Sequence, residues 1–325
     1  MKVLFIGGTG NISSAITELA IAQGMDLFLL HRNSTPPLHP GIQTIIGDAH
    51  DRDLLSSIAK EHFFDCVVNW VAYDVDHIIQ DIEIFRDRVK QYIFISSASA
   101  YQKIPSQENI SEKTPLENPY WEYSRKKIAC EKSLLKAFHQ MNFPATIVRP
   151  SHTYNTKVPL PVTSGYTGIY RLIKEKTFVI HDEGKSLWTL THAQDFAKGF
   201  IGLMGRPETT GEAYHITSDE ALTWNEIVQI TAEALGVEPN IFHIPSETIA
   251  KFIPSVGPGL LGDKKWSLCF DNSKIKNIVP EYKATISFRE GIIQTIDLYK
   301  KNLDYQIINH SLNAQVDHLI ESCCF

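Results

Sequence analysis

The first fifteen residues contain the feature that most limits how this chain can fold. An apolar run over residues 3–6 ends in the glycines of GGTG, and apolar residues then recur at helical spacing from Ile12. A short apolar run that ends in glycines is typical of a buried parallel strand. Strand, glycine turn and helix in this order form the context in which a glycine motif binds a dinucleotide. We therefore predict a nucleotide-binding βα unit at this end of the chain.

The positions of this turn have separate physical roles. Gly7 permits a backbone turn that a Cβ would obstruct, and Gly10 lets a pyrophosphate approach the main chain. The helix that follows presents free N–H groups and its positive dipole end to the phosphates. The third small position is Ser13 instead of glycine. An ordinary glycine-rich turn is the alternative, but the order of the elements favours a cofactor site that includes Gly7, Gly10, Asn11 and Ile12.

Strand and helix patterns alternate through the first half of the chain. Further strands are expected at residues 27–30, 43–46, 66–71, 92–95 and 145–148. Helical spacing is found at residues 53–59, 78–89 and 121–138. This rhythm predicts an α/β fold with a doubly wound, parallel, Rossmann-like sheet, whose ligands bind at the carboxyl ends of the strands.

The pattern changes beyond Pro150. Residues 157–162 are typical of a loop and residues 254–262 of a glycine- and proline-rich loop, whereas helices are expected at 193–204 and 224–235 and a strand at 214–217. We expect residues 1–155 to form the dinucleotide-binding domain, with returning segments near 189–217 and 268–280. Residues 156–188 and 218–325 are expected to form most of a smaller, discontinuous C-terminal substrate lobe.

Composition limits the compartment and the partners. The formal net charge is −6, which opposes a nucleic-acid or anionic-membrane partner. No apolar run approaches the length of a membrane span, and Met1 and Lys2 lead directly into a predicted core strand, so neither a membrane anchor nor a secretory signal is expected. The five cysteines have neither metal-site nor disulfide spacing. We expect reduced thiols, no bound metal and a cytoplasmic location.

A tyrosine and a lysine carry the candidate chemistry. Tyr123 and Lys127 share a face of the predicted helix, where the lysine would lower the pKa of the phenol. Such a tyrosine can give or take the proton of a substrate hydroxyl, and Ser97, just after a predicted strand, could hydrogen-bond the same oxygen. Hydride transfer to or from a nicotinamide needs an acid or base of this kind at the carbinol oxygen.

The Tyr-x-x-x-Lys pattern is weak by itself, because Tyr170 and Lys174 form a second copy. No serine-rich strand end precedes that copy, so we treat it as a coincidence. The alternative for Tyr123 is a half-buried helix tyrosine whose ring belongs to the core. Ser97 and the glycine turn favour the catalytic interpretation.

Together these segments resemble the extended short-chain dehydrogenase/reductases of the NAD-dependent epimerase/dehydratase type. The matching pieces are GGTGNIS at 7–13, GD at 47–48, VVNWVA at 67–72, FISSASAY at 94–101, YSRKK at 123–127, RPSHTY at 149–154, THAQDFAKG at 191–199 and DNSKIKNIVPEY at 271–282. The resemblance implies an oxidoreductase, epimerase or dehydratase with a nicotinamide cofactor, a small-molecule substrate and a homodimer formed through paired helices. All three reactions begin at a carbinol–carbonyl pair, so the sequence leaves the choice open.

The resemblance also implies roles for single residues. Ser97, Tyr123 and Lys127 would be the catalytic set, with Tyr123 and Lys127 also touching the cofactor. Asp48 would lie near the adenine and Ala72 beside the cofactor. From the residues alone, Asp48 could equally be a turn residue after its strand.

Two departures from the family pattern concern the substrate, which could be a sugar or a sugar nucleotide. Enzymes that act on nucleotide sugars usually have asparagine where this chain has His152, and often have an arginine where residues 186–189 read SLWT. A UDP- or dTDP-sugar is therefore disfavoured. Tyr101 and His152 are the candidate substrate contacts, although His152 could equally be a satisfied structural histidine.

The end of the second predicted strand bears on the cofactor. Enzymes that prefer NAD usually have a carboxylate there, whereas this strand ends in HRNS. Arg32 suits a 2′-phosphate, which favours NADP over NAD, and the alternative is an arginine that points into solvent. The alternative to an enzyme is a protein of the same fold that senses dinucleotides or binds RNA without catalysis. The intact Ser97, Tyr123 and Lys127 set and the acidic net charge argue against it.

Overall fold

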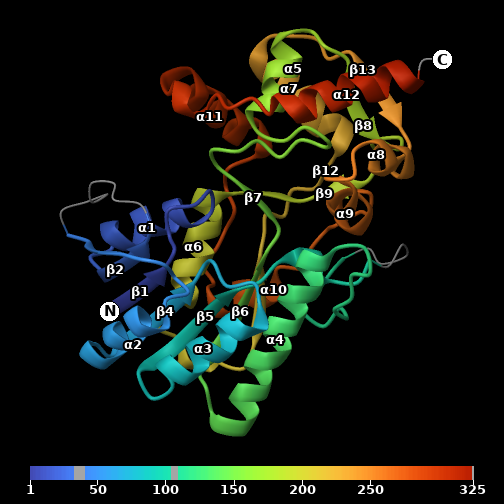
Figure 1. Ribbon diagram of the computed structural model, residues 1–325. Helices are drawn as coiled ribbons and strands as arrows, with labels where there is room; N and C mark the ends of the chain where they lie inside the picture. The colour runs from blue at the N-terminus through green and yellow to red at the C-terminus, as the bar shows by residue number, and fades with distance from the viewer. Residues whose placement is uncertain (33–40, 104–108, 324–325) are drawn as a thin grey trace.

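A seven-stranded parallel sheet organises the half of the molecule that contains the N-terminus (Figure 1). The computed structural model describes residues 1–32, 41–103 and 109–323. The strand order is β11-β6-β5-β4-β1-β2-β3, and each neighbouring pair is parallel. The strands are β1 (Lys2–Ile6), β2 (Asp26–His31), β3 (Gln43–Ile46), β4 (Phe64–Asn69), β5 (Val89–Ile95), β6 (Ala145–Pro150) and β11 (Ala213–Ile216). The strand order reverses between β1 and β4, which is where such sheets bind ligands, and the predicted doubly wound fold is confirmed.

Both faces of the sheet are covered by helices because successive strand residues point to opposite faces. Val3 and Phe5 of β1 pack with one set of helices, and Leu4 and Ile6 pack with the other. The first set is α1 (Ser13–Ala22), α6 (Ala193–Leu203) and α10 (Ser273–Ile278). The second set is α2 (Arg52–Glu61), α3 (Val75–Phe85) and α4 (Glu122–Met141). Burial on both faces explains why these strands are continuous apolar runs in the sequence.

One predicted helix ends earlier in the structure than expected, and its last predicted residue belongs to a strand. The helix expected over residues 78–89 ends at Phe85, and Val89 begins β5, where it pairs with Phe64 of β4. Asp87 has a φ of +61°, a left-handed turn that separates the two elements. Val89 continued the apolar spacing of the helix, so periodicity alone could not separate the helix from the strand.

The other half of the molecule is assembled from short strand pairs and helices (Figure 1). The pairs are β7 (His152–Tyr154) with β10 (Leu190–His192), β9 (Leu187–Trp188) with β12 (Leu222–Thr223), and β8 (Phe178–His181) with β13 (Ile241–Ile244). The helices are α5 (Tyr166–Ile173), α7 (Trp224–Leu235), α8 (Ser246–Phe252), α9 (Gly257–Gly259), α11 (Phe288–Lys301) and α12 (His310–Cys323). We call this half the lobe. The assignment of residues to two domains divided near residue 155 stays a prediction.

The glycine- and proline-rich segment at 254–262 was expected to be a loop, and this was wrong. It contains α9 and runs into a π-helical turn, Leu260–Lys264. A Cβ on Gly262 would lie 2.8 Å from Oδ1 of Asn118, and one on Gly259 would touch the ring of Trp121 at 3.7 Å. The glycines therefore allow close packing against the start of α4. They do not mark a loop.

Within the described residues, no helix combines the length and the apolar character needed to cross a membrane.

Candidate active site

A cavity of about 660 Å³ lies where the carboxyl ends of β1, β4, β5 and β6 meet the lobe. The sheet side contributes the glycine turn after β1, the residues after β5 and the start of α4. The lobe contributes His152, Trp188 and the π-helical turn. Of the predicted site residues, the cavity brings together Gly7, Gly10, Asn11, Ile12, Ser97, Tyr123, Lys127 and His152. Its size and its place at the switch point suit a cofactor together with a substrate.

The backbone of the glycine turn excludes a side chain at one more position than the sequence analysis named. Gly7 has a φ of +87° and Gly8 a φ of +123°. A Cβ on Gly8 would lie 2.6 Å from Cδ1 of the buried Leu29. Sequence reasoning named Gly7 and missed Gly8, because the contact with Leu29 of the neighbouring strand has no local signature.

The start of α1 fits the pyrophosphate of a dinucleotide. A Cβ on Gly10 would meet only Oγ of Ser13, at 3.5 Å, so the main chain is open to close approach. Oγ of Ser13 accepts a hydrogen bond from the Gly10 N–H, and within the described residues no side chain caps α1 at Ile12. The side-chain oxygen of Asn11 is already occupied by donors from Thr156. Main-chain N–H groups and the helix dipole are thus what the turn offers to an anion.

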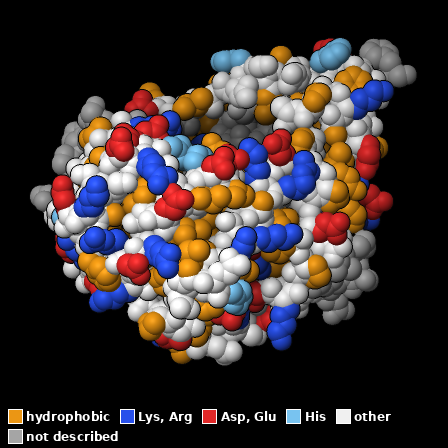
Figure 2. Space-filling view, turned by 60° about the horizontal axis from the view of Figure 1, so that its bottom comes forward, with side chains coloured by type: hydrophobic (Ala, Val, Ile, Leu, Met, Phe, Trp, Pro, Cys, Tyr) orange, Lys and Arg blue, Asp and Glu red, His pale blue; other side chains and the backbone are white. Residues whose placement is uncertain are grey.

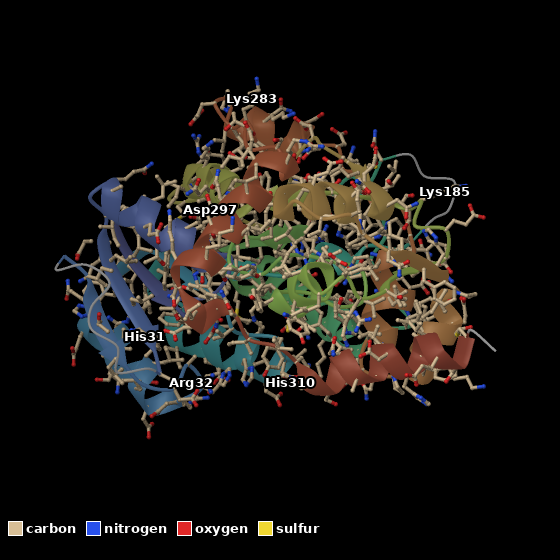
Figure 3. The ribbon with its side chains drawn as sticks, turned by 90° about the horizontal axis from the view of Figure 1, so that it is seen from above. His31, Arg32, Lys185, Lys283, Asp297 and His310 are labelled. Carbon is tan, nitrogen blue, oxygen red and sulfur yellow. The ribbon has the colours of Figure 1, made fainter. Side chains whose placement is uncertain are left out.

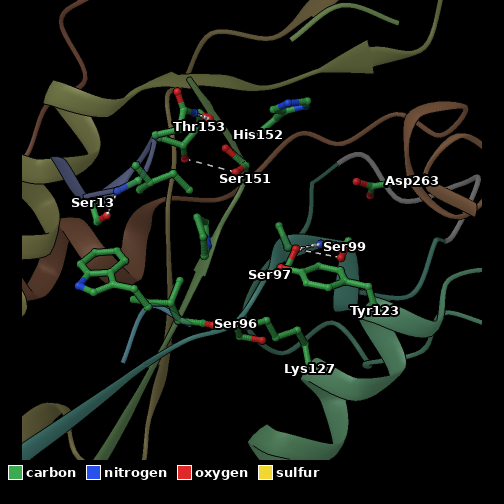
Figure 4. A pocket seen from close by; sticks show the side chains of 18 of the residues that line it. Ser13, Ser96, Ser97, Ser99, Tyr123, Lys127, Ser151, His152, Thr153 and Asp263 are labelled. Carbon is green, nitrogen blue, oxygen red and sulfur yellow. Dashed lines mark hydrogen bonds between the residues drawn. The ribbon is translucent and has the colours of Figure 1, made fainter. Parts of the chain in front are cut away.

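Ser97 and Tyr123 lie side by side in the wall of the cavity (Figure 4). Ser97 follows β5, and its Oγ lies 2.8 Å from Oγ of Ser99, which lies 2.7 Å from Oγ of Ser124 on α4. This chain of hydroxyls joins the end of the strand to the start of the helix. Burial raises the pKa of Tyr123, while hydrogen bonding with Ser97 works in the opposite direction.

The pKa of Tyr123 is thus raised overall in this structure, and the expectation of a phenol with a lowered pKa is not met. Lys127 is buried, and its Nζ donates to the carbonyl oxygens of Ala72 and Ile95, both at 2.7 Å. Nζ lies 5.7 Å from the centroid of the Tyr123 ring. Burial also lowers the pKa of Lys127 to about 8. Desolvation of the phenol outweighs a cation whose bonds are directed to the main chain.

His152 presents one nitrogen to a neighbour. Nε1 of Trp188 donates to its Nδ1 at 3.3 Å, which assigns the ring proton of a neutral histidine to Nε2. Burial, followed by the charge of Lys264, lowers the pKa of His152 to about 3. His152 is thus a neutral hydrogen-bonding group that lines the cavity.

Four predicted residues do not line the cavity: Arg32, Asp48, Ala72 and Tyr101. Ala72 acts through its carbonyl oxygen, which holds Lys127. Asp48 accepts a hydrogen bond from the His50 N–H, as a turn residue does. The Tyr101 hydroxyl is buried beside Arg149 and His215, at 3.1 Å from each, so the geometry gives no support to a substrate contact there.

Arg32 lies beside His31 at the end of β2, on the sheet side of the molecule (Figure 3). Ser34, the other residue considered for a 2′-phosphate, lies outside the described residues. The second Tyr-x-x-x-Lys copy is on α5, and neither Tyr170 nor Lys174 lines the cavity.

Sequence reasoning missed two charged residues of the π-helical turn, Asp263 and Lys264, which both line the cavity. Nζ of Lys264 donates to the carbonyl oxygens of Leu160 and Pro161, at 2.9 and 2.7 Å. Burial lowers the pKa of Lys264 to about 8. The only local signal was the sequence GDKK after a glycine-rich stretch, which by itself predicts an exposed turn.

Comparisons with known proteins agree with this architecture. The model of the NAD dependent epimerase/dehydratase family matches residues 3–217. The 2′-dehydrokanamycin reductase of Streptomyces kanamyceticus is 22% identical over 288 residues, which cover 87% of this chain and 80% of the reductase. The chloroplast stem-loop binding protein of 41 kDa b from Arabidopsis thaliana is 25% identical over 257 residues, 74% of this chain and 65% of that protein.

A solved structure has the same fold. The dTDP-glucose 4,6-dehydratase of Bacillus anthracis, determined in complex with NAD, superimposes with a TM-score of 0.77 at 18% identity. The match covers 94% of this chain and 98% of the dehydratase. The family model matches residues 3–217, which include the whole switch point and all seven strands of the sheet except part of the first. The chain therefore belongs to the NAD-dependent epimerase/dehydratase family.

Proposed function

We propose that this protein is a nicotinamide-dependent oxidoreductase that interconverts a carbinol and a carbonyl, and that its net reaction is carbonyl reduction. The observation that carries the proposal is a single cavity that joins the glycine turn to Ser97, Tyr123 and Lys127. Family membership supports the cofactor class. A relative named as a reductase, similar over 87% of this chain, supports the direction.

Tyr123, Ser97 and Lys127 have different roles in the transfer of the proton to the carbonyl oxygen. The Tyr123 hydroxyl donates the proton to this oxygen, and the Ser97 hydroxyl hydrogen-bonds to it. Because burial raises the pKa of Tyr123, the phenol is protonated at neutral pH, which is the form needed for reduction. Lys127, fixed by two main-chain carbonyls, holds a positive charge behind the phenol as it loses its proton. The nicotinamide, when bound, supplies the hydride.

Three measurements test this function. Purified protein is titrated with NADPH and NADH while nicotinamide fluorescence is followed, and oxidation of the reduced cofactor is then assayed against a panel of aldehydes and ketones. We expect binding, and oxidation with some members of the panel. Mass spectrometry of the purified protein checks the reaction type, because a tightly retained cofactor would indicate an epimerase or dehydratase. A protein that binds neither cofactor would contradict the proposal.

We further propose that NADP is preferred over NAD. The end of β2 carries His31 and Arg32 and no carboxylate. Nδ1 of His31 is buried and makes no hydrogen bond to a described residue. A guanidinium and an imidazole at this position suit a 2′-phosphate, whereas an acidic residue would repel it.

The expected effect of Arg32 is modest because the side chain is exposed. One exposed contact between a charge and a phosphate contributes about 1 kcal/mol, or roughly fivefold in affinity. Arg32→Ala should therefore weaken NADPH binding about fivefold and leave NADH binding unchanged. Arg86→Ala removes another exposed arginine, beside Asp87 on the turn before β5, and should change neither affinity. Equal affinities of the wild type for NADPH and NADH would refute the preference.

A second candidate function is the non-catalytic RNA binding considered in the sequence analysis, since the chloroplast relative is named as a stem-loop binding protein. The net charge of −6 opposes it, and acidic and basic side chains are interspersed over the face seen in Figure 2. Salt-dependent binding of an RNA stem-loop by a protein that oxidises no cofactor would favour this alternative.

The homodimer and the cytoplasmic location stay predictions. The apolar faces of α3 and α4 cover the sheet through Ile78, Phe85 and Leu134, so these faces are not available to a second copy. Ile79 of α3 is exposed beside them.

A further inference from the structure

The lobe closes the substrate end of the cavity with a carboxylate. Asp263 lies on the π-helical turn, and its Oδ1 is 3.1 Å from Nζ of Lys103. Both side chains are largely removed from water, with 16% of the aspartate and 6% of the lysine exposed. Asp263 lies across from Tyr123, and its carboxylate is directed into the cavity (Figure 4). It is thus a hydrogen-bond acceptor at the place where a substrate would meet the catalytic tyrosine.

The position of Asp263 relative to Tyr123 is fixed by a buried asparagine. Nδ2 of Asn118 donates to the carbonyl oxygens of Ser99 and Gly262, at 2.9 and 2.8 Å. Its Oδ1 accepts the N–H of Trp121 at 3.1 Å, immediately before α4. One side chain therefore joins the end of β5, the start of the catalytic helix and the turn that carries Asp263.

The cations around this end of the cavity already have partners. Lys103 is paired with Asp263, Lys127 with two main-chain carbonyls and Lys264 with two others. Among the described residues that line the cavity there is no arginine. A diphosphate is normally held by cations and bidentate arginines, and this pocket would place its charges near a carboxylate instead.

The remaining surface suits a ring that carries hydrogen-bond donors. Trp121, Trp188 and Phe270 contribute aromatic faces to the cavity, and Nε2–H of His152 is a donor. Aromatic faces pack against the apolar face of a ring, and a carboxylate accepts hydrogen bonds from hydroxyl or ammonium groups.

We infer that Asp263 determines substrate specificity by accepting a hydroxyl or ammonium group of a non-phosphorylated ring and by disfavouring nucleotide diphosphates. This inference rests on the proposed function, since it concerns the substrate of the same site. Lys103 is the counter-ion of this carboxylate and opposes the rise that burial causes in the pKa of Asp263.

The test measures ligand binding without turnover. Protein loaded with NADP⁺ is titrated with methyl α-D-glucoside, D-glucosamine and UDP-glucose while the fluorescence of the cavity tryptophans is followed. The wild type should bind at least one free sugar more tightly than UDP-glucose. Glucosamine that binds at least tenfold more tightly than the glucoside identifies an ammonium as the preferred donor, and similar affinities identify a hydroxyl.

Substitutions at Asp263 and at Lys103 should change the ligand affinities in opposite directions. Asp263→Asn should weaken the free sugars at least tenfold and strengthen UDP-glucose several-fold, because Lys103 loses its carboxylate partner. Lys103→Met should weaken the binding of UDP-glucose relative to the wild type and strengthen the binding of glucosamine. Glu247→Gln is the matched control, since it removes a carboxylate that pairs with the neighbouring Lys265 at 2.5 Å but does not line the cavity. The control should leave all three affinities unchanged.

NADPH affinity separates a failure of this inference from a failure of the proposed function. A wild type that does not bind NADPH contradicts the function itself. A wild type that binds NADPH but binds UDP-glucose more tightly than the sugars, or binds neither sugar, overturns the role of Asp263. Unchanged affinities in both variants, with NADPH binding intact, overturn it too. If Asp263→Asn loses NADPH binding through misfolding, the signs found with Lys103→Met decide.

Discussion

The sheet and the lobe supply the site in different ways. On the sheet side, Gly7 directly follows β1, and Ser97 lies two positions after the last residue of β5. Parallel strands bring their carboxyl ends together whatever their separation in the sequence. In the lobe, Asp263 reaches the cavity through close packing of glycines against α4 and through the hydrogen bonds of Asn118. Regular strands can thus place the residues of the common chemistry, while a residue on an irregular segment is proposed to select the substrate.

The glycines of the two regions should respond very differently to a methyl group. Gly8 has a φ of +123° and packs against Leu29 of the sheet, so Gly8→Ala should lower the free energy of unfolding by roughly 2–4 kcal/mol. Gly236 ends α7 in the lobe with a φ of +72°, and a Cβ there would meet no atom of the described residues within 4 Å. Gly236→Ala should cost about 1 kcal/mol. Denaturant unfolding measures both, and equal losses would contradict the difference in packing.

Two carboxylates, one buried under the sheet and one partly exposed in the lobe, provide a comparison with a smaller expected effect on stability. Asp81, under the sheet, accepts hydrogen bonds from Asn69 and Tyr92, and burial raises its pKa to about 6. Because the folded protein binds this proton more tightly than the unfolded chain, the stabilising contribution is present below about pH 4 and is lost as the pH rises through 6. Asp81→Asn should therefore raise the free energy of unfolding at pH 7 by up to about 3 kcal/mol.

The lobe supplies the opposite case for that measurement. Asp317 pairs with Arg171 at 2.8 Å and with Lys176. Burial by itself would raise the pKa of Asp317, but these two partners hold it below its usual value. Its contribution is present above about pH 4 and is lost as the pH falls. Asp317→Asn should lower stability at pH 7 and have less effect under acid conditions. Urea unfolding of both variants at about pH 4 and pH 7 checks the signs, and a less stable Asp81→Asn at neutral pH would contradict the account.

The sequence was sufficient where a local pattern determines the structure. Strands buried on both faces are apolar runs, so the sheet and the residues after β1 and β5 could be predicted. Helical spacing placed Tyr123 and Lys127 on one face of α4, and both reach the cavity.

Contacts between distant segments set the features that could not be predicted. Gly8 is constrained by Leu29 of another strand, and Tyr101 is buried by the Arg149 network. The pKa of Tyr123 depends on desolvation that arises only after folding. Asp263 reaches the cavity through the packing of the lobe against α4, which no spacing in the sequence records.

The most direct test of the account compares two tyrosines. Tyr123→Phe removes the hydroxyl that is proposed to give the proton, and Tyr170→Phe removes the hydroxyl of the second copy, which lies outside the cavity. Turnover is measured as NADPH oxidation with a carbonyl compound found active in the panel, and NADPH affinity is measured beside it. We predict that Tyr123→Phe loses at least about a hundredfold in turnover and keeps wild-type NADPH affinity, while Tyr170→Phe matches the wild type in both. Wild-type turnover by Tyr123→Phe would contradict the central claim.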